Sequence, residues 1–167
     1  KLTGSEKNYK EIFNASSDTM IIHDLDSGEI LDVNQTFEKI FGYTKEEAKQ
    51  LNVSDLSADE IANDKTAFLR LIKEELVEGG KVSEWYTKKK NGQRFWSEVA
   101  FSKTEIDDNI KTLGVLRDVS DRKKVELELH NYRNNLEVLV RDRTVELENS
   151  KDLAETANRA KSEFLSN

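Results

Sequence analysis

Residues 82–103 read VSEWYTKKKNGQRFWSEVAFSK, and this stretch decides the fold. Val82–Lys89 and Arg94–Lys103 are rich in the aromatic and β-branched residues that are typical of strands. Asn91-Gly92 lies between them and favours a type I′ turn, which predicts an antiparallel hairpin. The run from Phe95 to Phe101 is apolar on both of its alternating sets, so we expect both faces of the sheet to be covered.

Three further strands are predicted on either side of this hairpin. Met20–His23 and Ile30–Val33 flank a turn-forming cluster, and Lys111–Val119 follows a reversal at Asp107-Asp108-Asn109. Helical segments separate the first two strands from the last three. This order predicts an α+β fold, with a single five-stranded antiparallel sheet and helices on one face. The other face is expected to be covered by an N-terminal helix or by a second subunit.

Apolar periodicity and capping residues predict the first two helices. Tyr9, Ile12 and Phe13 recur at helical spacing and indicate an amphipathic helix near the N-terminus. Asn34 can cap the following helix with its side-chain oxygen, and Gly42 can end it in the left-handed conformation.

Two capping boxes predict two more helices. Thr44 with Glu47 is expected to open a short helix. Ser57 with Glu60 is expected to open a longer one, which Gly79-Gly80 would stop.

The last part of the chain has the pattern of a coiled coil. Asp121–Asn167 contains no Gly or Pro, and its apolar residues recur at steps of three and four. Two successive steps of four around Leu136 look like a stutter, which unwinds a supercoil locally. We expect a parallel homodimer, with an antiparallel partner helix as the alternative. The predicted seam is Val125, Leu129, Tyr132, Leu136, Val140, Leu147, Ala154 and Ala157.

Several short motifs, taken in this order, resemble the PAS domain family. They are Asp24–Ile30, Val33-Asn34, Phe41–Thr44, Lys89–Gly92 followed by Phe95-Trp96, and Asp118–Ser120 followed by Asp121–Lys123. The ending, Ala160–Asn167, resembles the lead-in to the phosphoacceptor box of sensor histidine kinases. The resemblance implies an N-terminal helix or linker over residues 1–17, a PAS domain over 18–120 and a coiled-coil signalling helix over 121–167.

This resemblance implies a sensory and transmitting module of a bacterial-type two-component histidine kinase. The family's exit motif maps onto Asp118, Ser120 and Arg122, where a charge-assisted hydrogen bond would set the angle of the last helix. A response regulator would bind only to domains outside this chain. Two alternatives stay open: a PAS module that regulates a nucleotide (diguanylate) cyclase, and a ligand-free dimerisation or scaffold module.

Members of the PAS family often bind a small molecule between the sheet and the helices. Covalent flavin photochemistry needs a cysteine, and this chain has none. Haem ligated by histidine would need one on the long helix, and residues 57–78 contain none. Flavin without an adduct, an organic acid or no ligand at all stay open. The candidate walls are Ile22, Phe37, Ile40, Phe41, Leu51, Leu56, Phe68, Tyr86, Val99 and Val115.

Composition narrows the remaining function classes. The net charge of -7 argues against nucleic acid as a partner, because phosphate binding needs clustered cations. The two histidines, His23 and His130, form no metal or catalytic cluster, so we predict neither a metal site nor catalytic residues. His23 is expected to face solvent or the cover of the sheet.

The chain is expected to be a cytoplasmic segment of a longer protein. No stretch approaches the roughly 18 apolar residues that a membrane span requires. The chain opens with Lys1 and has its single methionine at Met20, so a membrane anchor could lie upstream.

Overall fold

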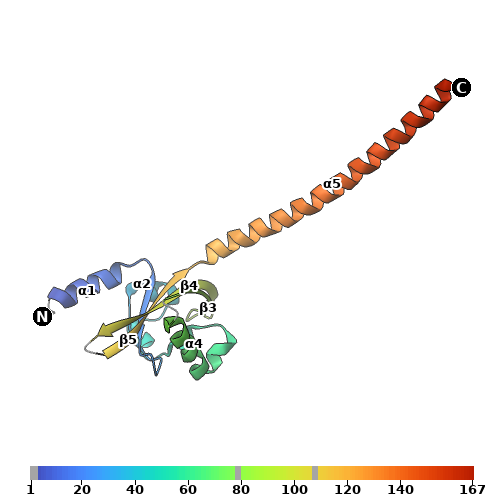
Figure 1. The fold of residues 1–167 in the computed structure, drawn as a ribbon. Coiled ribbons are helices and arrows are strands. Elements are labelled where there is room, and N and C mark those ends of the chain that lie inside the picture. The colour runs from blue at the N-terminus through green and yellow to red at the C-terminus, as the bar shows by residue number, and fades with distance from the viewer. Residues whose placement is uncertain (1–3, 78–79, 107–108) are drawn as a thin grey trace. The chain divides into compact units, whose positions relative to one another are not determined.

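The computed structural model describes residues 4–77, 80–106 and 109–167. Within this part of the chain, two strands are followed by short helices, a longer helix, three strands and a final long helix (Figure 1). The elements are α1 Gly4–Ala15, β1 Thr19–His23, β2 Ile30–Val33, α2 Gln35–Phe41, α3 Lys45–Ala48, η1 Val53–Leu56, η2 Glu60–Asn63, α4 Lys65–Val77, β3 Val82–Lys88, β4 Arg94–Ile106, β5 Asn109–Asp118 and α5 Ser120–Ser166.

The strands form the predicted five-stranded antiparallel sheet, in the order β2-β1-β5-β4-β3. The last strand, β5, therefore lies between β1 and β4. Its register with β4 runs from Ser97 opposite Asp118 to Ile106 opposite Asn109. The strand that leads into α5 therefore pairs with both halves of the sheet.

The hydrophobic core lies between one face of the sheet and the helices from α2 to α4. Phe37, Phe41 and Ile72 of these helices are at most 1% exposed. Aromatic rings from the strands meet them, since Phe41 and Phe95 lie 5.5 Å apart between ring centroids in an edge-to-face arrangement. We call this the inner face of the sheet.

Two predicted caps are confirmed. The Asn34 side-chain oxygen accepts a hydrogen bond from the Phe37 amide at 3.0 Å, and α2 ends at Gly42 with a φ of 79°. Thr44 and Glu47 form the reciprocal capping box of α3. Each pair satisfies amide groups that the first turn of a helix leaves without partners.

The predicted capping box of Ser57 with Glu60 is wrong. Ser57 is buried and pairs with Thr87 in an isolated bridge, while its hydroxyl accepts a hydrogen bond from the Asp59 amide at 3.1 Å. The long helix α4 begins only at Lys65, where Asp64 accepts hydrogen bonds from the amides of the first turn. Its predicted stop at Gly79 lies outside the described residues, and Gly80 follows with a φ of 79°.

The hairpin between β3 and β4 is confirmed, but its predicted turn type is wrong. The turn hydrogen bond runs from the Gly92 amide to the Lys89 carbonyl at 2.9 Å, so Gly92 occupies the last position of the turn. In a type I′ turn, Asn91 and Gly92 would be the two central residues. The other predicted reversal falls on Asp107 and Asp108, which lie outside the described residues.

The predicted N-terminal helix is confirmed as α1, and it lies against the outer face of the sheet. Phe13 is 6% exposed, whereas Tyr9 borders a surface groove together with Ile22 on β1. Burial, and secondarily Asp32, raise the pKa of Tyr9 to about 12. Trp96 on the same outer face remains 41% exposed, so α1 covers only part of this face.

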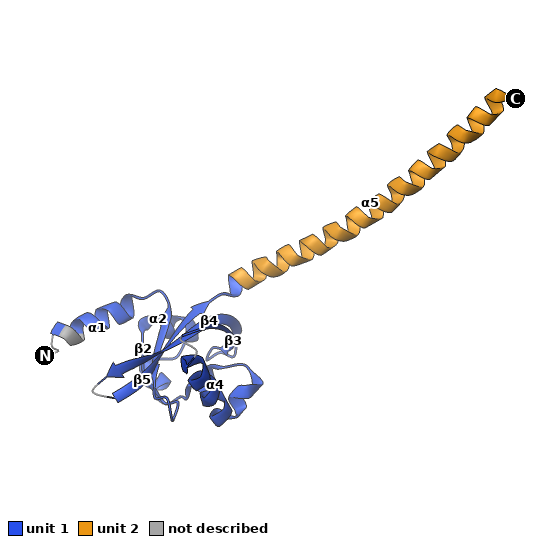
Figure 2. Ribbon diagram, in the orientation of Figure 1, with its two compact units in different colours: residues 1–121 blue, residues 122–167 orange. Residues whose placement is uncertain are grey.

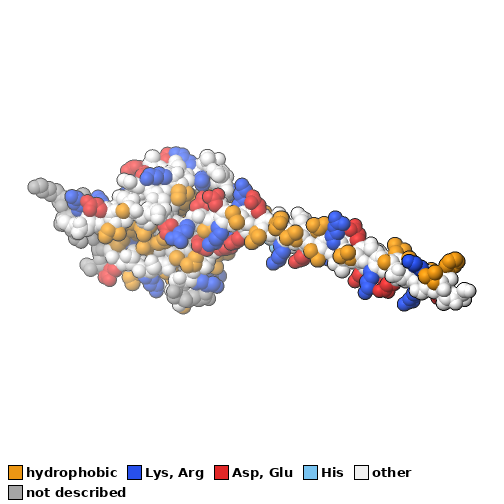
Figure 3. Space-filling model, turned by 90° about the horizontal axis from the view of Figure 1, so that it is seen from above, with side chains coloured by type: hydrophobic (Ala, Val, Ile, Leu, Met, Phe, Trp, Pro, Cys, Tyr) orange, Lys and Arg blue, Asp and Glu red, His pale blue; other side chains and the backbone are white. Residues whose placement is uncertain are grey.

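The chain divides into two compact units, residues 1–121 and residues 122–167 (Figure 2). The second unit is most of α5, a helix of 47 residues whose side chains from Lys124 onward are exposed. Apolar side chains recur along it between charged ones (Figure 3). None of the helices in the described part of the chain is long and apolar enough to span a bilayer.

Candidate functional site

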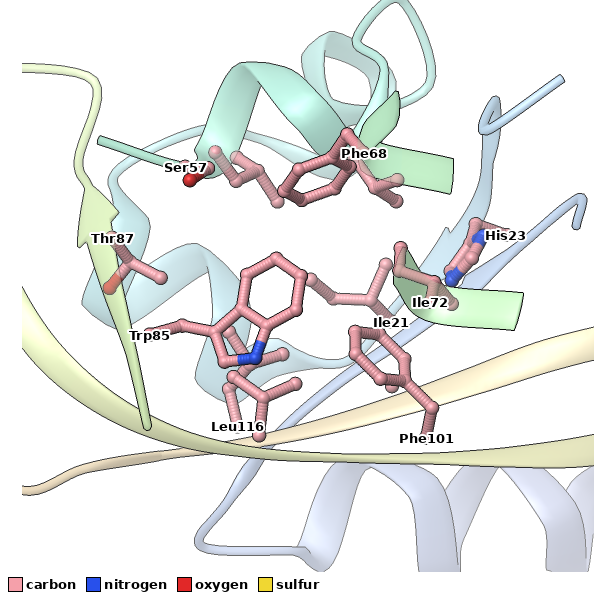
Figure 4. A pocket seen from close by; sticks show the side chains of 13 residues that line it. Ile21, His23, Ser57, Phe68, Ile72, Trp85, Thr87, Phe101 and Leu116 are labelled. Carbon is pink, nitrogen blue, oxygen red and sulfur yellow. The ribbon is translucent and has the colours of Figure 1, made fainter. Parts of the chain in front are cut away.

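A small cavity of about 40 Å³ lies within the core, between the inner face of the sheet and the helices η1 and α4 (Figure 4). All strands except β2 contribute to its walls. The lining residues are Ile21, His23, Val53, Leu56, Ser57, Phe68, Ile72, Trp85, Thr87, Val99, Phe101, Gly114 and Leu116. The cavity is therefore a largely apolar space that is in contact with most of the sheet.

Three aromatic rings shape the cavity. Phe68 of α4 meets Trp85 edge to face with 4.9 Å between centroids. Trp85 meets Phe101 at 5.7 Å in the same manner. Edge-to-face contacts fix the rings relative to one another, so the walls are preformed by packing between helix and sheet.

Each polar side chain at one end of the cavity has a hydrogen-bond partner in the backbone. Ser57 and Thr87 lie there, opposite the end that holds His23 (Figure 4). The Thr87 hydroxyl donates to the Phe95 carbonyl at 3.1 Å, and Ser57 accepts from the Asp59 amide. These two groups therefore each hold the local backbone through one hydrogen bond.

The opposite end of the cavity is lined by His23, and Thr112 lies beside His23 on the neighbouring strand without lining the cavity. His23 is 1% exposed and Thr112 is fully buried, and their Cα atoms pair across β1 and β5. Neither His23 Nε2 nor Thr112 Oγ1 has a hydrogen-bond partner among the described residues. Buried polar side-chain atoms are nearly always paired, so His23 gives this end of the cavity unused hydrogen-bonding capacity, and Thr112 adds a second unpaired atom next to it.

Burial lowers the pKa of His23, which keeps its imidazole neutral near pH 7. Nδ1 lies 3.0 Å from the Asp24 carbonyl oxygen and must donate its proton to it. Nε2 is then the acceptor nitrogen of the ring. Of the two expected positions of His23, solvent is wrong, because the residue is 1% exposed and faces the helices that cover the inner face of the sheet.

The turn after His23 is held rigidly. The Asp24 carboxylate accepts hydrogen bonds from the Ser27 amide at 2.9 Å and from the Lys111 ammonium at 3.0 Å. The Ser27 amide and then Lys111 hold the pKa of Asp24 well below its usual range. Lys111 belongs to β5, so this ion pair also ties the end of β1 to the strand beside it.

Three of the predicted wall residues line the cavity: Leu56, Phe68 and Val99. Phe37 and Phe41 are buried in the core next to it, while Ile40 and Leu51 are partly buried against that core. The assignment of Ile22, Tyr86 and Val115 to the cavity wall is wrong. Successive side chains of a strand point to opposite faces, and these three point outward.

The residues that replace them are their neighbours in the chain. Ile21, Trp85 and Leu116 line the cavity from the inner face. Sequence reasoning also missed Gly114, which lines the cavity with bare backbone. A Cβ atom there would lie 3.3 Å from the Phe101 ring.

The cavity does not fit a flavin or a haem. Pockets for cofactors and drug-sized ligands have volumes of roughly 300 to 1,000 Å³. The space here is about 40 Å³, and neighbouring rings of the core surround it. The residues within the described ranges also include no group of three or more metal-ligating side chains.

The exit from the sheet begins two residues after the cavity wall. Leu116 lines the cavity, and Asp118 ends β5 with its carboxylate accepting a hydrogen bond from the Ser120 amide at 2.9 Å. The Val119 amide donates to the Trp96 carbonyl at 2.9 Å. Arg122 forms an ion pair with Glu126 within α5, at 3.5 Å. The predicted hydrogen bond between Asp118 and Arg122 would join the two compact units and stays a prediction.

Comparison with known proteins identifies relatives among sensors. Sensor histidine kinase TmoS of Ectopseudomonas mendocina is 25% identical over 150 residues, which cover 86% of this chain and 15% of that protein. A methyl sulfide methyltransferase-associated sensor of Methanosarcina acetivorans is 27% identical over 140 residues, covering 84% of this chain and 14% of that protein. The chain thus spans about a seventh of the length of these relatives.

Solved structures agree with the fold. A domain of a sensory box sensor histidine kinase/response regulator from Geobacter sulfurreducens aligns with a TM-score of 0.53 at 28% identity, over 68% of this chain and 94% of that one. The family model described as PAS domain matches residues 17–121, which include the whole sheet and its helices. The chain therefore belongs to the PAS domain family.

Proposed function

We propose that this chain is the sensory and transmitting PAS module of a bacterial two-component sensor histidine kinase. The observation that carries the proposal is the course of β5. Gly114 and Leu116 line the cavity, and the same strand ends at Asp118 and continues into α5. A change at the cavity therefore has a short covalent path to the output helix.

A second path runs through the neighbouring strands. The buried Ser97 hydroxyl donates to the Trp85 carbonyl at 3.3 Å, and Ser97 is paired with Asp118. Trp85 is an aromatic wall of the cavity, so a displacement of its strand bears on the residue that ends β5. Only a few kcal/mol between two arrangements of this joint would suffice to shift an output equilibrium.

The transmitting element in this proposal is a parallel homodimer of α5. Its seam includes Leu129, Leu136 and Leu147, which are 66%, 41% and 70% exposed in the single chain. An isolated helix would leave this stripe in water, whereas a second copy would bury it. The N-terminal helix α1 is a second candidate surface for the dimer, because Ile12 is 73% exposed.

The catalytic steps belong to other parts of the proposed kinase. This chain would change the rate at which an attached dimerisation and ATP-binding region phosphorylates its own histidine. The response regulator would receive the phosphoryl group from that region. ATP and response regulators are cytoplasmic, so the proposed role places the module in the cytoplasm.

The test is a chimera that joins this chain, through Asn167, to the dimerisation and ATP-binding domains of a characterised histidine kinase. Seven, or instead four, residues would be inserted after Asp142 in α5. Seven residues preserve the seam in a 3.5-residue repeat, whereas four rotate it. We expect autophosphorylation to survive the seven-residue insertion and to change at least fivefold with the four-residue one.

The matched control carries the same insertions in a chimera that lacks residues 1–118. In this control no PAS domain acts on α5. The four-residue and seven-residue insertions should therefore not show the fivefold difference expected of the full-length chimera. Equal activity of all full-length chimeras would contradict a relay through α5. A scaffold without an enzyme would then become the better explanation of the chain.

A further inference from the structure

We propose that the cavity selects a compact neutral molecule of about two to four non-hydrogen atoms that carries a hydrogen-bond donor, such as a short-chain alcohol or a primary amide. Its polar anchor is His23 Nε2, assisted by Thr112 Oγ1. The inference rests on the proposed sensory function and names the chemical class of its signal.

The size of the cavity limits the ligand. A buried water needs about 10 to 15 Å³, and a cavity of roughly 150 Å³ accommodates benzene. The cavity offers about 40 Å³. A molecule of a few heavy atoms fits between the rings of Phe68, Trp85 and Phe101, and a six-membered ring does not.

The lining excludes charged ligands. The side chains of the described residues that line the cavity are aliphatic or aromatic, apart from His23, Ser57 and Thr87. The nearby cation of Lys111 already binds the Asp24 carboxylate. A carboxylate or phosphate ligand would lose its hydration without gaining a counter-ion, which is costly in an apolar interior.

The anchor selects for a donor. The Nδ1 proton of His23 is committed to the Asp24 carbonyl, so the neutral ring offers Nε2 as an acceptor. Thr112 lies directly opposite on β5, and cross-strand neighbours have Cβ atoms about 5 Å apart. An alcohol can donate to His23 Nε2 and accept from the neighbouring Thr112 hydroxyl, whereas a ketone has no proton to donate to His23 Nε2.

Gly114 keeps room for the ligand beside this anchor. It lies two residues after Thr112 on the inner face of β5, where a Cβ atom would approach the Phe101 ring to 3.3 Å. A bound molecule would therefore rest against the strand that leads to Asp118. Occupancy of the cavity is in this way linked to the proposed relay.

The test is a titration of the ¹⁵N-labelled chain with four molecules of equal heavy-atom count: 2-propanol, acetone, acetamide and acetate. Shifts of the His23, Thr112 and Gly114 amide resonances report binding at the cavity. At the ligand-efficiency ceiling, four heavy atoms give a Kd of about 40 µM, and millimolar values are the realistic range. We expect 2-propanol to bind at least tenfold more tightly than acetone, and acetamide at least tenfold more tightly than acetate.

Three variants locate the effect. His23→Phe removes the acceptor and keeps a ring of similar size, so it should abolish the preference for 2-propanol over acetone. Gly114→Ala should weaken binding of all the neutral molecules. Thr112→Val removes only an oxygen without a partner among the described residues, and it should fold and lose at least threefold in affinity for 2-propanol. The Thr112→Val variant keeps the test decisive if His23→Phe does not fold.

Two results would overturn the inference: equal affinity of the wild-type chain for 2-propanol and acetone, or no shifts at these three amides with 50 mM of any probe. The second result would mean that the cavity holds water alone. The titration needs only the chain itself, so it is independent of kinase output. Binding without regulation of the chimera would contradict the proposed function and support the inference, and regulation without binding would do the reverse.

Discussion

The side-chain amide of Asn34 donates a hydrogen bond to the carbonyl oxygen of Phe13, 3.1 Å away. The same side chain donates to the Asp18 carbonyl at 2.9 Å and accepts from the amides of Met20 and Phe37, each at 3.0 Å. Asn34 thus joins the end of α1, the linker, β1 and the start of α2. Asn34 is therefore one of the side chains that tie α1 and its linker to the sheet, beside Asn14 of α1, which accepts a hydrogen bond from the Gln35 amide.

Replacing Asn34 by Ala should lower the free energy of unfolding by roughly 2 to 4 kcal/mol. The substitution leaves buried backbone groups without partners and removes the helix cap. Urea denaturation followed by circular dichroism measures the change. Asn63→Ala, at an exposed position of η2, is the control and should stay within about 0.5 kcal/mol of the parent. Equal effects of the two substitutions would contradict this role of Asn34.

The two tryptophans provide a matched test of the sheet's faces. Trp85 is 6% exposed and contacts Phe68 and Phe101, whereas Trp96 is 41% exposed and lies beside Tyr86 on the outer face. Trp85→Ala should cost about 3 to 5 kcal/mol of stability, and Trp96→Ala about 1 to 2 kcal/mol. Denaturation of both variants measures this. The reverse order would mean that the register of β3 and β4 is wrong by one residue.

His23 should make the stability of the domain depend on pH. Its folded-state pKa is lowered by burial, so the unfolded chain binds a proton first as the pH falls below about 6.5. The contribution that neutral His23 makes to the free energy of unfolding is therefore complete above that pH. Below it, stability should fall by up to about 1.4 kcal/mol per pH unit until the folded-state pKa is reached.

Urea denaturation of the parent and of His23→Phe at pH 7.5, 6.5 and 5.5 tests this effect. The stability of the variant relative to the parent should rise as the pH falls. His130→Gln controls for the second histidine, which lies on the exposed helix α5. Parallel pH profiles of the parent and His23→Phe would show that burial of His23 does not govern the effect.

The order of strands and helices along the chain and several helix starts could be predicted from the sequence because local signals determine them. Asn34 and Thr44 cap helices through contacts within three or four residues of the chain. Ser57 has the same local capping signal, but it pairs with Thr87 of β3 and does not begin a helix. A capping motif therefore predicts a helix start only where nothing distant competes for it.

The cavity was harder to predict, because its walls depend on which alternate residues of each strand face the helices. β4 carries apolar residues on both faces, so alternation in the Phe95–Phe101 run does not tell the inner face from the outer one. Ile22, Tyr86 and Val115 were each one residue away from the correct position. His23 and Gly114 were missed, since neither residue type signals a cavity wall without the fold around it.

The central claim is that α5 pairs in parallel with α5 of a second copy, and disulfide cross-linking tests it most directly. The chain has no cysteine, so each introduced cysteine is unique. Leu129→Cys and Leu147→Cys lie on the seam, and Asn134→Cys and Asp152→Cys lie on the opposite side of the same helix. Under mild oxidation we predict dimers of twice 19.2 kDa at the two seam positions and little cross-linking at the other two. Equal cross-linking at all four positions, or none at Leu129 and Leu147, would contradict the account.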